Sequence, residues 1–221
     1  RSEARKVAFF YGCFINFYRP DIGRKIIRML QSFKLDVVLP PQWCCGLPAL
    51  GNGNLTLARS FARKNVASLS NYIDAGYDVV YTCTSCGLCL LHDYQGILEI
   101  PEAKKIAENS YDLHEYVLKL ITEREIKPNF SEVNRTLAYH IPCHLRVQNI
   151  GLKTRDVLAL IPDTTVEAIE RCSGHDGTYG VKTEFRAASV KIATPVVEQL
   201  REKRAKGEIA GIDGRVEKQD A

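Results

Sequence analysis

The sequence predicts an α/β protein built from two tandem, pseudo-repeated small α/β units with mostly parallel sheets. Short apolar runs, typical of buried strands, alternate with longer segments whose apolar residues recur at helical spacing. Such alternation favours parallel sheets, because parallel neighbours need a crossover between them. The same order of segments then begins again in the second half of the chain. With 221 residues, 45% of them hydrophobic, the chain is long enough to bury a substantial core.

The first unit is expected to span residues 1–125. Its first strand, over 6–11, ends at Gly12-Cys13, and a helix follows from about Asp21 because apolar residues recur there every three or four positions. A second short strand over 35–39 stops at Pro40-Pro41. The remaining elements that we expect are a long amphipathic helix over 57–73, a strand over 77–81, and two shorter helices over 102–109 and 112–122.

The second unit is expected over residues 126–200 and repeats this order. We expect strands over 135–140 and 165–169, and helices over 153–161 and 184–200. Pro195 is expected to kink the last helix, since proline lacks the amide hydrogen that the helix needs. Residues 201–221 are rich in charges and poor in apolar side chains, which predicts a weakly structured tail.

Composition and charge narrow the class of protein. The net charge is only +4, and no basic stretch is interleaved with aromatic residues, so we expect no nucleic-acid partner. No signal peptide and no apolar run long enough for a transmembrane segment is present, which predicts a cytoplasmic protein that would reach the inner membrane only through partners. Because the chain begins at Arg1 and its only methionine is Met29, we expect it to be part of a longer protein.

Five cysteines in three separated stretches form the most informative pattern. They are Cys13, the adjacent pair Cys44 and Cys45, and the pair Cys83 and Cys86. Adjacent cysteines bridge each other only with strain, and a single zinc ion needs four ligands. Five thiols therefore fit a polynuclear metal cluster better than one zinc ion or a disulfide. Since each stretch follows a predicted parallel strand, we expect the loops to converge at the strands' carboxyl ends.

Two further residues near this pattern have open interpretations. Cys89 lies one helical turn beyond Cys86 between Leu88 and Leu90, and we expect it to be a small core residue. Trp43, the only tryptophan, either shields the metal site from water or simply packs in the core.

A second constellation of cysteines and histidines lies in the second half. These residue types suit zinc or a histidine-bearing iron–sulfur site. His144 and His175 are also candidate catalytic proton donors beside an electron acceptor, because histidine titrates near neutral pH. The alternative is that these histidines only hydrogen-bond within their loops. The set comprises His140, Cys143, His144, Cys172 and His175.

The spacing Cys13-x30-Cys44-Cys45-Gly46-x36-Cys83-x2-Cys86 resembles the cysteine-rich "CCG" domain family. That family includes the B subunit of heterodisulfide reductase, the C subunit of anaerobic glycerol-3-phosphate dehydrogenase, and the iron–sulfur subunits of glycolate and lactate oxidation systems. The resemblance spans about residues 6–200. In the second half it rests on the segments 139–144 and 171–174.

The resemblance implies an iron–sulfur cluster of the 4Fe-4S type, cubane or noncubane, held by Cys13, Cys44, Cys45, Cys83 and Cys86. In the second half only Cys143 and Cys172 carry over, because Ser173 replaces a cysteine and the final pair is absent. That half is therefore expected to hold a second metal (iron or zinc), a partly non-cysteine cluster, or nothing.

The resemblance also implies an electron-transfer subunit or domain of a dehydrogenase or reductase complex. Such a subunit would relay electrons between a flavoprotein dehydrogenase subunit, a ferredoxin-like domain, or both, and a quinone or disulfide acceptor. One alternative is a heterodisulfide or thiol reductase that acts at the cluster itself. The other is a zinc-stabilised assembly module with no redox role.

Overall fold

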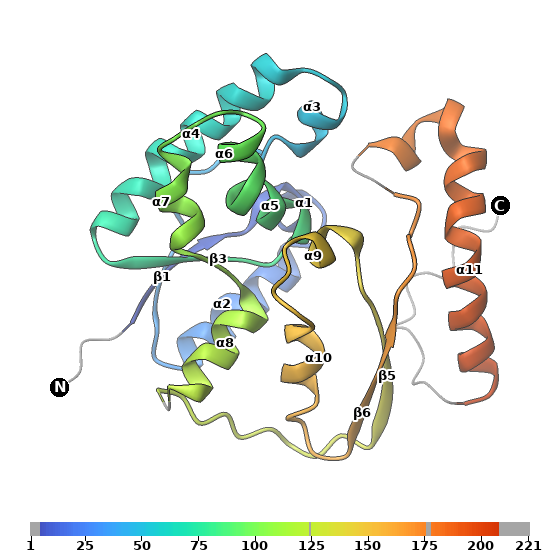
Figure 1. Cartoon of the computed structure of the whole chain (residues 1–221). Helices are drawn as coiled ribbons and strands as arrows, with labels where there is room; N and C mark the ends of the chain where they lie inside the picture. Colours follow the sequence, from blue (N-terminus) through green and yellow to red (C-terminus); the bar gives the residue numbers. More distant parts are fainter. Residues whose placement is uncertain (1–4, 124, 176–177, 208–221) are drawn as a thin grey trace. The chain divides into compact units, whose positions relative to one another are not determined.

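The computed structural model describes residues 5–123, 125–175 and 178–207, which form two compact units. The first unit contains the chain up to Pro128 together with His144–Gly151, and the second contains Asn129–Cys143 and the chain from Leu152 onward. Each unit has its own parallel sheet (Figure 1). The predicted α/β class with mostly parallel sheets is therefore confirmed.

The first unit is a doubly wound four-stranded sheet. All its strands are parallel, in the order β2-β1-β3-β4. Figure 1 shows helices α4 and α7 on one face of this sheet and α2 and α8 on the other, as right-handed crossovers require when the strand order reverses at β1. The strands are β1 (Lys6–Phe10), β2 (Asp36–Val38), β3 (Tyr77–Tyr81) and β4 (Ser110–Asp112).

The four helices that the sequence predicted in this unit agree with the predicted segments to within about two residues. They are α2 (Pro20–Ser32), α4 (Leu55–Asp74), α7 (Ala103–Glu108) and α8 (Leu113–Thr122). Strand β4 and the remaining short helices, of three to six residues, were not predicted. Segments this short rarely show a periodic pattern. These short helices are α1 (Gly12–Phe17), α3 (Leu47–Gly51), α5 (Thr84–Leu88), the π-helix η1 (Cys89–Asp93) and α6 (Tyr94–Gly96).

The core of the first unit reaches the predicted cysteine loops. Residues 7–10 of β1 are all at most 1% exposed, because helices cover both faces of the sheet. On the α4 side, Ala8 and Phe10 pack with the buried face of α4 and with three thiols of the cysteine loops. Those thiols belong to Cys45, Cys86 and Cys89.

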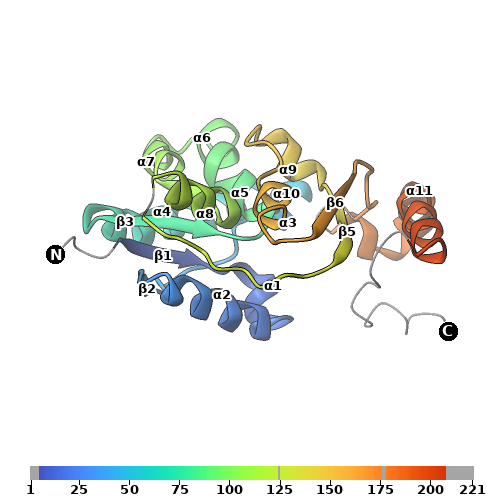
Figure 2. The ribbon, with the colours of Figure 1, turned by 90° about the horizontal axis from the view of Figure 1, so that it is seen from below.

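The second unit has a two-stranded parallel sheet of β5 (Arg135–His140) and β6 (Thr164–Ile169). Helix α10 (Lys153–Leu158) connects the strands, and the 3₁₀ turns η2 (Tyr179–Val181) and η3 (Thr183–Phe185) lead into α11 (Arg186–Ala205). Figure 2 shows α10 and α11 on opposite sides of this sheet. Helix α9 (Cys143–Val147) begins where the chain returns from the second unit to the first.

Helix α11 extends beyond its predicted end. It runs through Pro195 as one helix and continues to Ala205, so the first five residues of the expected weakly structured tail are helical. Lys203 forms an ion pair with Glu167 of β6, which attaches this last part of the helix to the sheet. Residues 208–221 of the expected tail lie outside the described residues.

The two halves of the chain share one order of elements. Each half has a strand, a short helix that contains a cysteine, a second helix, a parallel strand, a cysteine–x–glycine loop, and a helix of 20 residues. The two sheet-containing halves thus fit a tandem repeat. Among the helices that the structure describes, none is both long and apolar enough to cross a bilayer.

Candidate metal centre

Three loops at one edge of the first sheet bring together the five cysteines that the sequence singled out. Cys13 lies in α1, directly after β1, and the pair Cys44 and Cys45 lies in the loop after β2. Cys83 and Cys86 follow β3, at the start of α5 and within it. Because the three strands are parallel neighbours, their carboxyl ends place these loops side by side.

The pKa values of the five cysteines are shifted in one continuous series, each by hydrogen bonding to its neighbour. The pKa of Cys13 is lowered to about 6, chiefly by a hydrogen bond from the thiol of Cys44. The pKa of Cys44 is raised because its proton bridges to Cys13 and to Cys45. The whole series runs Cys13–Cys44–Cys45–Cys86–Cys83.

Donors and acceptors alternate along this series. The thiol of Cys86 donates to Cys45 and to Cys83, so its own pKa is raised, whereas the pKa of Cys83 is lowered to about 7 by that bond. The pKa of Cys45, which is 4% exposed, is lowered by hydrogen bonds from Cys44 and two other thiols. Adjacent thiolates can all ionise only when cations replace the shared protons. This set of donors therefore fits a group of metal ions.

Cys89 is a sixth thiol in contact with this group. It is 1% exposed and belongs to the hydrophobic core, as expected. Its thiol also donates to Cys45, and it lies 3.5 Å from the carboxylate of the buried Asp93. Both residues are in the π-helix η1, an irregular form that is frequent at functional sites. The spacing of one turn from Cys86 was the only sequence signal for this contact.

Two glycines let the backbone approach the sulfur atoms. Gly12 has a φ of +68°, and a Cβ at this position would lie 3.1 Å from the Sγ of Cys86. Gly46 has a φ of +96°, and its N–H donates to the Sγ of Cys44 at 3.5 Å. Both backbone conformations favour glycine over other residues.

A buried asparagine holds the loop that contains the adjacent cysteines. Asn65 of α4 is fully buried, and its Oδ1 accepts a hydrogen bond from the N–H of Trp43 at 2.8 Å. Its Nδ2 lies within hydrogen-bonding distance of the carbonyl of Trp43 (3.3 Å), the carbonyl of Cys44 (3.1 Å) and the hydroxyl of Tyr94 (3.0 Å). The sequence did not identify Asn65, because a lone asparagine within an amphipathic helix has no distinguishing pattern.

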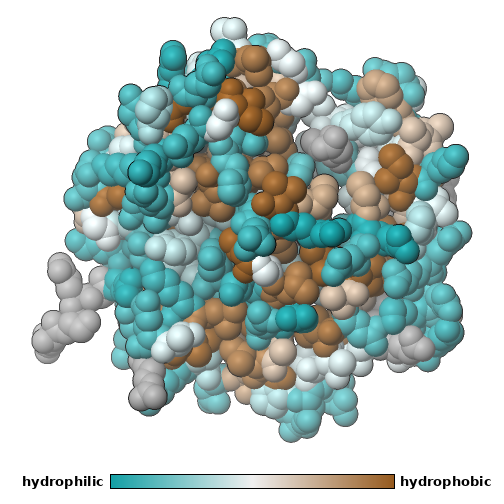
Figure 3. Space-filling view, viewed as in Figure 1, coloured by the Kyte–Doolittle hydropathy of each residue, from teal (hydrophilic) through white to brown (hydrophobic). Residues whose placement is uncertain are grey.

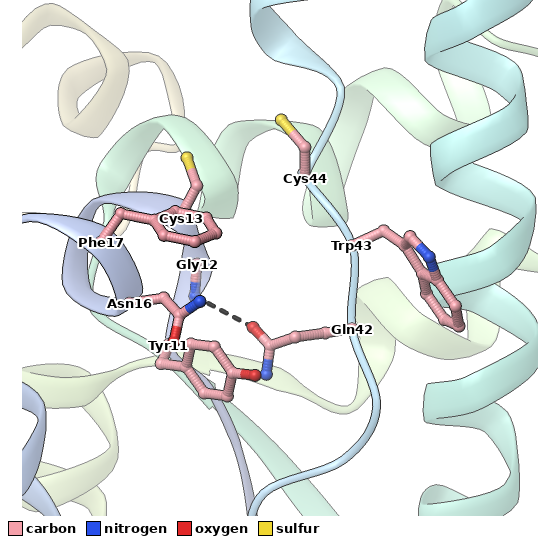
Figure 4. A pocket seen from close by; sticks show the side chains of 8 residues that line it. All are labelled: Tyr11, Gly12, Cys13, Asn16, Phe17, Gln42, Trp43 and Cys44. Atoms are coloured by element: carbon pink, nitrogen blue, oxygen red, sulfur yellow. Dashed lines mark hydrogen bonds between the residues drawn. The ribbon is translucent and has the colours of Figure 1, made fainter. Parts of the chain in front are cut away.

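A pocket of about 250 Å³ opens beside Cys13 and Cys44 (Figure 4). The two sulfur atoms point toward the same side of it, whereas the indole of Trp43 points away toward α4. Gln42 joins the two walls, since its Oε1 accepts from the N–H of Gly12 at 3.0 Å. Trp43 is 40% exposed, so core packing alone does not explain it. The pocket is lined by Tyr11, Gly12, Cys13, Asn16, Phe17, Gln42, Trp43 and Cys44.

The second constellation is divided between the units. His144 belongs to the first unit, where its Nδ1 lies 2.9 Å from the hydroxyl of Ser85, between Cys83 and Cys86 in the sequence. Its neighbour Gln148 donates to the carbonyl of Thr84 at 2.7 Å and accepts from the buried hydroxyl of Tyr81 at 2.7 Å. The segment around His144 is therefore attached to the loop after β3.

The other members of this constellation lie in the second unit. Cys143, Cys172 and His175 are exposed, and the Nε2 of His140 lies 2.7 Å from the carbonyl of Arg171. The N–H of Gly174 donates to the Sγ of Cys172 at 3.4 Å, and its φ is +71°. The loop thus repeats the local geometry of Cys44 and Gly46 in the first unit.

No compact site for a single metal ion is present among the residues that the structure describes. No three histidine, cysteine, aspartate or glutamate side chains are grouped for one ion there. A zinc–thiolate site would need every sulfur at about 2.3 Å from a common centre. The thiols of the first unit form instead an extended series, which a group of several metal ions would match.

Comparison with known proteins identifies the class. The model of the cysteine-rich domain family, abbreviated CCG, matches residues 7–92 and 137–209. The chain therefore belongs to this family of cysteine-rich domains.

Several characterised and uncharacterised proteins are similar to it. The C subunit of anaerobic glycerol-3-phosphate dehydrogenase from Escherichia coli is 30% identical over 89% of this chain and 50% of its own length. The B subunit of fumarate reductase (CoM/CoB) from Methanothermobacter marburgensis is 30% identical over 91% of this chain and 39% of its own. An uncharacterised iron–sulfur protein from Methanocaldococcus jannaschii is 32% identical over 80% of this chain and 33% of its own length. The chain thus spans half or less of the length of these relatives.

Proposed function

We propose that the first unit holds an iron–sulfur cluster through Cys13, Cys44, Cys45, Cys83 and Cys86. The observation that supports this most is that these five cysteines follow three neighbouring parallel strands and lie at one edge of the sheet. Soft thiolate ligands suit iron–sulfur clusters, and a relative carries the name iron–sulfur protein. The cluster would be of the 4Fe-4S type, either a cubane with four of the cysteines or a noncubane assembly that uses all five.

The proposed role is electron relay within a dehydrogenase or reductase complex. When bound, such a cluster takes up and releases single electrons. Two of the relatives described above are named as subunits of a dehydrogenase and a reductase. The proposed partners are a flavoprotein dehydrogenase subunit, a ferredoxin-like domain, or both, and the proposed acceptor is a quinone or a disulfide. The chain's own residues would fix the ligand loops, chiefly through Asn65 and the two glycines.

Metal analysis of the whole chain tests this proposal. Anaerobically purified protein should contain about four iron and four sulfide ions per first-unit site, with an EPR signal that appears or disappears on reduction. The double variant Cys44→Ser/Cys45→Ser should abolish that signal, because three remaining thiols are too few for either cluster. The matched double variant Cys143→Ser/Cys172→Ser, in the second unit, should leave it intact. Zinc without sulfide, or an unchanged signal in Cys44→Ser/Cys45→Ser, would overturn the proposal.

A second candidate function is reduction of a disulfide or thiol substrate at the cluster itself. The pocket beside Cys13 and Cys44 favours it, because simple relay needs no cavity at the metal site. Reduced protein would then be reoxidised rapidly by a small organic disulfide in a stopped-flow experiment. Reoxidation by a quinone analogue only would favour electron relay instead.

For the second half we propose an incomplete metal site, for iron or zinc, around Cys143 and Cys172. The N–H···S contact of Gly174 supports it, because the loop has the shape that the proposed ligand loop has in the first unit. His175 follows in the same loop, and His144 is held beside the loop of Cys83 and Cys86, where it could donate a proton. The double variant Cys143→Ser/Cys172→Ser should lower the total metal content without changing the EPR signal of the first site.

A further inference from the structure

One face of helix α4 has an unusual charge pattern. Between Leu55 and Ile73 the helix contains no acidic residue, and Arg59 and Arg63 are a like-charged pair four positions apart. Such pairs destabilise a helix, so helix stability does not explain them. The 20-residue helix α11 of the second unit differs, because its charges alternate and Glu202 pairs with Lys206.

The cations of α4 line a shallow groove of about 460 Å³, which we call the cationic groove. It is formed by Thr56, Arg59, Ser60, Arg63 and Lys64. Arg59 makes one ion pair, 3.6 Å from a carboxylate of Glu99 that is 80% exposed. Within the part of the chain that the structure describes, Arg63 has neither an ion pair nor a side-chain hydrogen bond. Figure 3 shows hydrophilic side chains along α4, at the upper left of the view.

The cationic groove adjoins the proposed metal centre. The ammonium group of Lys64 lies 5.6 Å from the centre of the Trp43 ring, and Trp43 directly precedes Cys44. On the buried side of the same helix, Asn65 bonds to the backbone of both Trp43 and Cys44. A molecule that occupied the groove would therefore contact the loop of the adjacent cysteines.

We propose that the cationic groove, together with Trp43 and Leu57, docks an acidic surface of a protein electron-transfer partner. This inference rests on the proposed electron-transfer function. Trp43 and Leu57 are 40% and 42% exposed, and a tryptophan beside arginines is the composition typical of interface hot spots. Carboxylates are the partner groups that the unpaired charge of Arg63 complements.

A protein surface fits this groove better than a lipid bilayer does. A helix that lies in a membrane interface needs an exposed apolar stripe. The apolar stripe of α4 is already used in the core, since Ala58, Ala62 and Leu69 are fully buried. Two separate apolar side chains, Trp43 and Leu57, remain exposed beside the charges. Charge complementarity mainly steers encounters between proteins and fixes their orientation.

The fluorescence of Trp43 reports binding at this face, because it is the only tryptophan. We would titrate the whole chain with tryptophan-free polyglutamate, with phosphatidylglycerol vesicles and with inorganic phosphate. Arg63→Glu should weaken polyglutamate binding about tenfold at low salt. Arg201→Glu is the matched control, since Arg201 is an exposed arginine of α11; it should bind as the unchanged chain does. This readout does not depend on iron content.

A kinetic measurement connects docking with electron transfer. Iron-loaded protein would be mixed in a stopped-flow instrument with a reduced acidic ferredoxin or with the small reductant methyl viologen radical. Arg63→Glu should slow reduction by ferredoxin about tenfold and leave reduction by the viologen unchanged. If neither reductant reduced the protein, the proposed function would fail, and the titration would still decide the docking site.

Several results would overturn the docking proposal. The first is that Arg63→Glu and the unchanged chain bind polyglutamate equally well. The second is that Arg201→Glu loses as much polyglutamate affinity as Arg63→Glu does. The third is that the chain binds vesicles or phosphate and does not bind polyglutamate. The second result would show an effect of net charge only. The third would show a membrane surface or a small anion in place of an acidic protein.

Discussion

Replacing Asn65 by alanine should destabilise the first unit and loosen the loop of the adjacent cysteines without removing any sulfur. Asn65 is fully buried on α4, and its amide connects that helix to the backbone of Trp43 and Cys44 and to the hydroxyl of Tyr94. Alanine would leave the N–H of Trp43 without its acceptor, and a buried donor without a partner is costly.

The magnitude follows from the number of hydrogen bonds that one amide can make. The Nδ2 group has two hydrogens for three acceptors within 3.3 Å, so it donates about two full bonds, and Oδ1 accepts one more. At about 1 kcal/mol for each bond, the loss of unfolding free energy is about 3 kcal/mol. For a chain of this size that corresponds to a decrease in Tm of about 6–12 °C.

Thermal unfolding of the metal-free chain measures this loss, and iron content after anaerobic reconstitution measures the effect on the loop. The matched control is Asn71→Ala, an exposed asparagine on the same helix, which should change Tm by less than 2 °C or so. Asn65→Asp should be no better than alanine, because its carboxylate would face two carbonyl oxygens. A decrease for Asn65→Ala as small as that of the control would refute the reasoning.

Three further predictions concern the thiol group. Gly12→Ala should lower the iron content and reduce the free energy of unfolding by about 1–3 kcal/mol, because Gly12 has a positive φ and lies close to the sulfur of Cys86. The control Gly96→Ala, at a glycine with open space around it, should have neither effect. Equal effects of the two changes would contradict the argument. In the metal-free chain the alkylation rate of Cys13, followed by mass spectrometry, should rise through a midpoint near pH 6, because the thiolate is the reactive form above its lowered pKa. Cys44→Ala should move that midpoint to higher pH, and an unmoved midpoint would show that the thiol–thiol bond is not the cause. Cys89→Ala should keep the iron and lower the reduction potential of the cluster, measured in an EPR titration, by about 40 mV, the equivalent of one lost hydrogen bond. Loss of iron would instead identify Cys89 as a ligand.

The sequence predicted the parts of the fold that show a strong period or a continuous apolar run. Strand β3, over 77–81, and strand β5, over 135–140, agree with the prediction at both ends, because each has a run of apolar residues at its centre and is bounded by turn or loop residues. Strand β4 has three residues, which is too short for a pattern. The end of α11 was missed because an ion pair with the sheet, a tertiary contact, overrides the polar character of its last turn.

The candidate site was predictable in its sulfur atoms and not in what holds them. Cysteines at the ends of predicted parallel strands must converge if the strands are neighbours, so spacing and topology together located the thiols. Asn65 and Gln148 act through hydrogen bonds to loops more than 20 residues away in the sequence. A polar residue within a helix, such as Asn65, or in the turn after one, such as Gln148, looks the same in the sequence whether it is solvated or buried. Only the three-dimensional structure therefore identifies these two positions.

The comparison of the two units separates the shape of the cysteine loop from its chemistry. In both loops the glycine has a positive φ and donates its N–H to the sulfur two residues earlier, at 3.5 Å for Gly46 and 3.4 Å for Gly174. In both, the glycine also packs closely against the backbone of the following 20-residue helix, because an added Cβ would lie 3.4 Å from the carbonyl oxygen of Ala58 or 2.3 Å from that of Ser189. The second loop keeps this shape although Ser173 stands where the first has Cys45. The turn is therefore set by glycine and helix packing, and the number of cysteines on it is free to differ between the two units.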